Sequence, residues 1–108
     1  LYMDWARLSL ERSRGLSKGL YGRDIPYVLL MHIGAFDARM LPRLLALYRE
    51  KGAAFVTLEA AMRDPFYAAD FSAAPSLAPT TLGEAMKAKG LTPPPRAWSF
   101  ADLDALCR

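Results

Sequence analysis

His32 is the only histidine of the chain, and it lies within an apolar stretch, YVLLMHIGAF, at residues 27–36. An imidazole has a pKa near neutrality, so it can donate a proton to a leaving group and recover it. The apolar run is bounded by Pro26 and Gly34 and has a length typical of a strand buried on both faces. We therefore predict a buried strand that carries His32 to a functional edge. The alternative is a core histidine bonded to a backbone carbonyl.

Other residues that could do chemistry are few. The single Cys107 excludes an internal disulfide and a zinc site built from cysteines, and we expect it to be a spare thiol. Asp37 could orient His32 or cap a helix, and Glu59 could line a cleft or serve a helix dipole; the helix roles are the commoner ones. Four aromatic residues could stack on sugar rings or anchor packing: Phe66, Tyr67, Trp98 and Phe100.

Composition narrows the classes of function. The chain has 108 residues, 53% of them hydrophobic, which suits one domain or part of a larger one. Its net charge of +3 comes from 14 basic and 11 acidic residues spread along the chain, so we predict no nucleic-acid partner. No apolar run reaches the roughly 18 residues of a membrane span. The first residues are charged where a secretory signal would be apolar. Because the chain starts at Leu1 inside a helical pattern, we expect that an N-terminal part has been removed.

Helical periodicity flanks the apolar run on both sides. Residues 2–21 have the pattern of an amphipathic helix, with Gly22 suited to a left-handed cap. A second helix is expected from near Asp37, its predicted cap, to Gly52, and residues 54–57 follow as a short strand. A strand, a helix and a strand connected at this length form a βαβ unit with a parallel pair. The carboxyl ends of that pair would hold His32 and Thr57 on one side, where chemistry gathers in α/β folds.

The rest of the chain is expected to cover this unit. Residues 58–63 read as a short helix capped by Thr57 and ended by Asp64-Pro65. We assign residues 1–67 to the α/β unit and residues 68–108 to a C-terminal wrap, with helical patterns at 82–89 and 100–106 and prolines at 93–95. Two strands cannot bury a parallel sheet, so the unit needs more sheet than the chain contains. An open sheet edge would favour self-association.

Residues 16–67 resemble the C-terminal part of polysaccharide deacetylases of the NodB-homology type. The resemblance is carried by GRDIPYVLLMHIGAFD at residues 22–37, by the helix LLALYREKG and by FVTLEAAMRDPFY. Leu30-Met31-His32 matches the Leu-x-His motif of that family. The resemblance implies an α/β fold: the C-terminal βαβ portion of a distorted (β/α) barrel, followed by a helical and Pro-rich wrap.

The family hydrolyses acetamide groups with a divalent metal, zinc in most members, and the resemblance gives His32 the role of general acid. The metal ligands of the family come from a Thr-Phe-Asp-Asp type segment and a His-x-x-x-His type segment, and this chain has neither. The ligands are therefore expected outside this chain, which supplies no metal residue itself. Asp4-Trp5 resembles a further family motif, but the helix expected over 2–21 explains both residues, so they are left out of the site.

The resemblance implies removal of acetyl groups from N-acetylated polysaccharide, such as chitin-like or peptidoglycan-like polymers. The polysaccharide is then the substrate, its contact residues are unassigned, and activity of this chain alone is not expected. A signal peptide in the missing N-terminal part would direct the enzyme to the periplasm or the extracellular space. The competing hypothesis is a non-catalytic or vestigial α/β module that binds a protein or a glycan.

Overall fold

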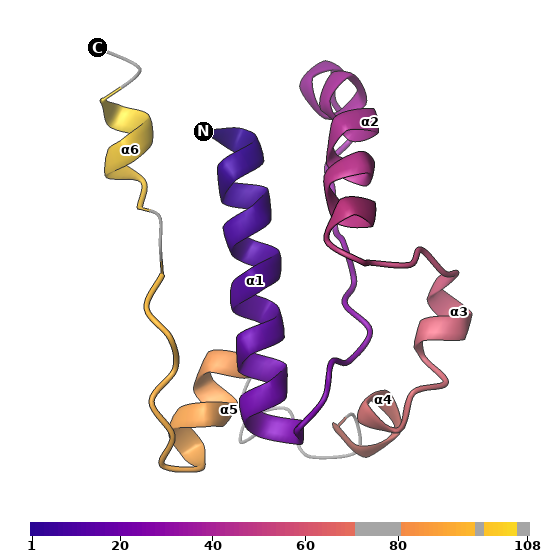
Figure 1. Cartoon of the computed structure of the whole chain (residues 1–108), viewed down its shortest axis with the longest axis vertical. Coiled ribbons are helices and arrows are strands. Elements are labelled where there is room, and N and C mark those ends of the chain that lie inside the picture. The colour runs from indigo at the N-terminus through magenta and orange to yellow at the C-terminus, as the bar shows by residue number, and fades with distance from the viewer. Residues whose placement is uncertain (71–80, 97–98, 106–108) are drawn as a thin grey trace.

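The computed structural model of the chain describes residues 1–70, 81–96 and 99–105. These residues form helices and no β-strand (Figure 1). The predicted α/β fold is therefore wrong, and so are the βαβ unit and the barrel portion. The described helices are α1 (Tyr2–Tyr21), α2 (Ala35–Glu50), α3 (Leu58–Ala61), α4 (Pro65–Asp70), α5 (Leu82–Ala88) and α6 (Ala101–Asp104).

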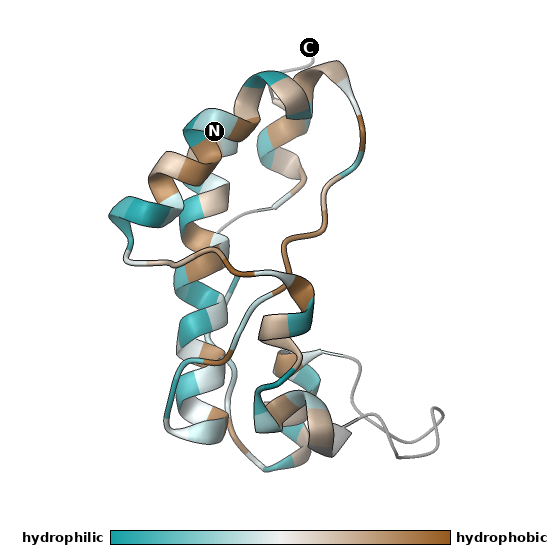
Figure 2. Ribbon diagram, turned by 90° about the vertical axis from the view of Figure 1, so that its right-hand side faces the viewer, coloured by the Kyte–Doolittle hydropathy of each residue, from teal (hydrophilic) through white to brown (hydrophobic). Residues whose placement is uncertain are grey.

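Two drawn-out connections stand where the strands were predicted. The first connection comprises residues 24–33 before α2, and the second connection comprises residues 53–57 after it. In Figures 1 and 2 the first runs along the long axis of the molecule, whereas the second runs across it. Within the described residues, the backbone N–H groups of 27–33 and 54–56 make no hydrogen bond. A strand exists only with a bonded neighbour, and neither connection has one here.

The long helices agree closely with the sequence pattern. The predicted helix over 2–21 is confirmed, and Gly22 ends it with φ of 70° and an N–H bond to the Lys18 carbonyl at 2.9 Å. The N-cap of α2 is Gly34, and Asp37 lies inside the first turn. The prediction that Asp37 caps this helix is therefore wrong. The cap of α3 is confirmed, because the Thr57 hydroxyl accepts the Ala60 N–H at 3.2 Å.

The shorter helices depart further from the expected bounds. The third helix ends at Ala61 and α4 begins at Pro65, so the predicted boundary at residue 67 falls inside α4. The start of α4 has a local cause. Asp64 accepts the Phe66 N–H at 2.9 Å, and Pro65 occupies the first helical position, where its missing N–H costs nothing. Thr81 and Glu84 form a capping box at the start of α5, which packs on α1 (Figure 1).

The described part of the chain has a small core. Its buried apolar side chains are Leu16, Ile25, Leu44, Ala61 and Met86. The accessible surface is 8146 Å², about a third more than the roughly 6,000 Å² expected for a compact protein of this mass. The Cα radius of gyration is 15.7 Å, against about 13 Å for a compact domain of this length. The molecule is therefore open.

The first connection shows this open packing most clearly. Val28, Leu29, Leu30 and Ile33 are all exposed, with Leu30 at 85%. Figure 2 shows hydrophobic stretches on the connections, outside the helices. The prediction of a strand buried on both faces is therefore wrong. An apolar run is buried only when other elements cover it, and the described residues provide no such cover.

Candidate functional site

His32 lies on the first connection, two residues before the N-cap of α2, and its side chain is exposed. Its neighbours Leu30 and Ile33 are exposed as well. The imidazole makes no hydrogen bond within the described residues. The alternative of a core histidine bonded to a carbonyl is therefore wrong for this structure. The histidine is instead available to a substrate or to a covering polypeptide.

Asp37 does not act on His32 in the described residues. It lies half-buried in the first turn of α2, where a carboxylate favours the positive end of the helix dipole. Its Oδ2 atom is 3.4 Å from the position that a Cβ on Gly34 would take. No hydrogen bond joins Asp37 to the imidazole, so its contribution is to the start of the helix.

A cavity of about 730 Å³, here called the α1 groove, lies between α1 and the two connections. Its walls are formed by Ser9, Leu10, Ser13 and Arg14 of α1, residues 24–29, Tyr48, residues 52–58 and Ala61. Thr57 lines the groove and His32 does not, so the structure does not bring these two predicted neighbours together in this cavity.

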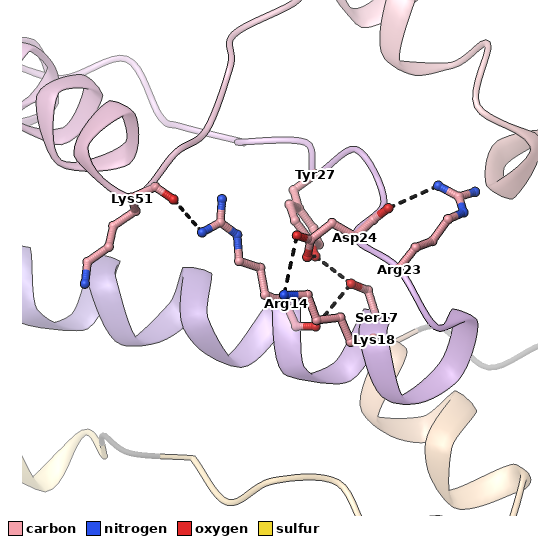
Figure 3. A network of polar contacts seen from close by, with 7 residues as sticks. All are labelled: Arg14, Ser17, Lys18, Arg23, Asp24, Tyr27 and Lys51. Carbon is pink, nitrogen blue, oxygen red and sulfur yellow. Dashed lines mark hydrogen bonds and ion pairs between the residues drawn. The ribbon is translucent and has the colours of Figure 1, made fainter.

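A polar network fastens the first connection to α1 (Figure 3). Ser17 is completely buried, and its Oγ atom lies 2.6 Å from the Tyr27 hydroxyl. That hydroxyl donates to Asp24 at 3.0 Å, and Lys18 pairs with the same carboxylate at 3.8 Å. Burial raises the pKa of the Tyr27 hydroxyl, while its contact with Ser17 acts in the opposite direction. These contacts hold the start of the connection and leave residues 28–33 without a comparable attachment.

Arg14 is the cation on the wall of the groove. Its Nη1 atom donates to the Lys51 carbonyl at 2.6 Å (Figure 3), while its Nε atom is buried without a partner. No carboxylate pairs with it among the described residues. A partly buried guanidinium with unused donors favours an anion beside it.

The residues that the structure describes do not form a metal site. The chain has one histidine, and the described residues contain no group of three or more His, Cys, Asp or Glu that could hold an ion. We therefore derive no step through a metal within this chain. The helices that the structure describes include none long and apolar enough to cross a membrane.

Two of the four aromatic candidates serve packing. Phe66 makes edge contacts with Tyr21 at 5.3 Å and with Tyr67 at 4.9 Å between ring centroids. The Tyr67 hydroxyl donates to the Pro26 carbonyl at 2.8 Å. Phe100 is exposed. The predictions for Trp98 and Cys107 lie outside the described residues.

The α1 groove and Arg14 were missed in the sequence. A signal was present, because Leu10, Arg14 and Ser17 recur at spacings of four and three and so share one face of α1. That periodicity indicates a face in contact with something. It does not predict that two irregular connections lie against this face of α1, because the path of the connections depends on contacts between residues far apart in the chain.

Comparisons with known proteins gave no match: no family model, no curated protein and no solved structure matches the chain. The interpretation of His32 and of the α1 groove therefore depends on their own residues and geometry.

Proposed function

We propose that this chain supplies the general-acid histidine of a metal-dependent enzyme that deacetylates N-acetylated polysaccharide, with the metal ligands on another polypeptide segment. The main support is the exposed position of His32 on the Leu-x-His segment. A proton donor must reach its acceptor directly or through one water, and a buried, bonded imidazole could not do so.

The chemistry assigned to His32 is a single proton transfer. Hydrolysis of an acetamide forms acetate and breaks the bond between the carbonyl carbon and the sugar nitrogen. The nitrogen leaves poorly as an anion, so the protonated imidazole donates its proton to the nitrogen as the bond breaks, and the product is a free amine. Histidine suits this step because its charge changes near neutral pH.

The apolar surface beside His32 supports a contribution from a second polypeptide segment. Leu30 and Ile33 flank the histidine and are exposed. A segment that covered them would bury apolar area, and it would also remove water from around the imidazole, which strengthens interactions with the reacting group. The same segment could carry the metal ligands that this chain lacks.

The test is acetate release from N-acetylglucosamine oligomers, with zinc or cobalt, by the chain mixed with a polypeptide that carries the aspartate and paired histidines of the family. We expect release only from the mixture, and a loss of about 100-fold or more with His32→Ala. Glu50→Ala, at an exposed residue in the last turn of α2, is the control for a general disturbance. Release by the chain alone would contradict ligands outside it, and undiminished release with His32→Ala would contradict the role of the histidine.

A second candidate function, a non-catalytic module that binds another polypeptide, is favoured by the same exposed apolar residues. Soluble proteins rarely leave such patches uncovered unless they bind something. In this proposal the ligand is a polypeptide, either another protein or a second copy of this chain, and neither nucleic acid nor a membrane span is involved. Binding of the apolar dye ANS tests the surface. We expect fluorescence enhancement by the wild-type chain that falls with Leu30→Ser and Ile33→Ser, and enhancement unchanged in both variants would oppose the proposal.

A further inference from the structure

We infer that the α1 groove is a binding site for a small organic anion, in which a carboxylate pairs with Arg14 and an apolar body lies against the second connection. His32, Leu30 and Ile33 do not line this groove. The site is therefore separate from the residues that carry the two proposed functions, and it depends on neither of them.

The size and the lining of the groove suit a small molecule with an apolar body. Its volume of about 730 Å³ lies within the roughly 300–1,000 Å³ of small-molecule sites, which are lined mostly by apolar side chains with a few polar groups. Its exposed apolar side chains are Val28, Leu29, Phe55, Val56 and Leu58. Contact with a ligand would remove part of their area from water, which drives binding.

The charged residues on the wall determine the sign of the ligand. Arg14 and Asp24 are the charged residues among those that line the groove. Asp24 already has partners, because it accepts a hydrogen bond from the Tyr27 hydroxyl at 3.0 Å and pairs with Lys18 at 3.8 Å. Arg14 has no carboxylate partner in the described part of the chain. The unbalanced charge of the wall is therefore positive, and an anion complements it.

Arg14 keeps one donor group that a ligand can reach. Its Nη1 atom donates to the Lys51 carbonyl, and its Nε atom is buried inside the chain. The Nη2 atom makes no hydrogen bond within the described residues, and it is not among the buried atoms that lack a partner, so it is accessible. Figure 3 shows the guanidinium between Lys51 and Tyr27, pointing away from the axis of α1. A carboxylate on Nη2 would form a charge-assisted hydrogen bond.

Three residues with hydroxyl groups line the groove as well. They are Ser9, Ser13 and Tyr48, and within the described residues none of their hydroxyls makes a hydrogen bond. Burial, and secondarily Tyr2, raises the pKa of the Tyr48 hydroxyl, so this group remains a neutral donor at neutral pH. Hydroxyl donors beside a guanidinium favour an anionic ligand over an uncharged one.

The experiment is isothermal titration calorimetry of the full chain with three ligands of equal chain length: octanoate, octanol and octylammonium. We expect saturable binding of octanoate, about tenfold or more tighter than that of octanol, because only the carboxylate gains a charge-assisted hydrogen bond. Octylammonium should bind more weakly than octanol, because its charge has the same sign as that of Arg14.

Three variants locate the two ends of the ligand. Arg14→Gln should lower the affinity for octanoate by about tenfold or more and change that for octanol by less than about threefold. Arg43→Gln, an equal charge change at an exposed residue of α2 outside the groove, should leave both affinities unchanged. Val56→Ser should weaken both ligands by about threefold, because it removes apolar contact area.

Each remaining outcome overturns a stated part of the site. Absence of saturable octanoate binding overturns the site itself, and octanol that binds as tightly as octanoate overturns the anion. An equal loss with Arg14→Gln and Arg43→Gln, or no loss with either, overturns the pairing with Arg14. Because Arg14→Gln alters the bond to the Lys51 carbonyl, circular dichroism checks its fold. Should that variant not fold, the three ligands on the wild type and on Val56→Ser decide alone.

Discussion

The packed region around α1 and the first connection contain similar apolar residues with opposite environments. Leu16 of α1 and Met86 of α5 are buried, whereas Leu30 and Ile33 of the first connection are exposed. A helix bonds its own backbone and needs cover on one face only, so α1 is satisfied by α2 and α5. A strand needs neighbours for its backbone and cover for both faces. The requirement of the helix is met within this chain, whereas the described residues do not meet the requirements of a strand.

The largest expected effect on stability comes from comparing two leucines, one in the packed region and one on the first connection. Leu44 of α2 is 2% exposed, and Leu30 is 85% exposed. Leu44→Ala should lower the free energy of unfolding by about 2–5 kcal/mol, because it removes buried area and leaves a cavity. Leu30→Ala should change it by less than about 0.5 kcal/mol. Urea unfolding followed by circular dichroism measures both.

A loss for Leu30→Ala as large as that for Leu44→Ala would break the comparison. It would mean that the first connection is covered in solution, by a second copy or by another element. Repeating the measurement at several protein concentrations separates these cases, because only a covering partner makes the loss depend on concentration.

The elements that the sequence predicted correctly are those with local causes. The helix over residues 2–21 and its cap at Gly22 follow from periodicity and from the freedom of glycine at positive φ. The cap at Thr57 and the helix near residues 82–89 have similarly local signals. Each depends on residues within about two turns of one another.

The wrong predictions concern which segments pair with one another, and not the conformational propensities of the residues. The run that contains Val28 and Leu30 has the composition of a buried strand, but composition cannot state whether a second strand is available. His32 was therefore predicted at the edge of a sheet, and the structure has it on an exposed connection. Asp37 was misjudged for a smaller reason: Gly34 starts α2 three residues earlier than the expected cap.

Two glycines test how far the backbone conformation of α1 and of its cap determines the stability of the chain. Gly22 has φ of 70°, a region that costs other residues about 1–2 kcal/mol, so Gly22→Ala should destabilise the chain by about that amount. Gly15 lies inside the same helix, and a Cβ added there would meet nothing within 4 Å. Gly15→Ala should therefore stabilise the chain by up to about 1 kcal/mol. Thermal unfolding gives both signs, and a loss with Gly15→Ala would indicate that another molecule packs against this position.

The smallest expected effect concerns how the first connection is tied at its start, next to Asp24. Arg23 donates to both oxygens of Asp64 at 2.6 and 2.8 Å and so links the chain before the connection to α4. The Arg23 guanidinium, and secondarily the Phe66 N–H, lowers the pKa of Asp64 below its ordinary 3.8. For a carboxyl group whose pKa is lowered by folding, the contribution to stability is complete above the ordinary pKa and disappears as the pH falls through the pKa of the folded state.

Between about pH 5 and about pH 3, the wild-type chain should thus lose more stability than Asp64→Asn, which cannot ionise. Glu11→Gln is the comparison variant: the pKa of Glu11 is lowered by a different pair, with Lys51, so this variant should keep the part of the loss that comes from Asp64. Equal losses in the wild type and Asp64→Asn would show that the tie at Asp64 does not hold the connection in solution.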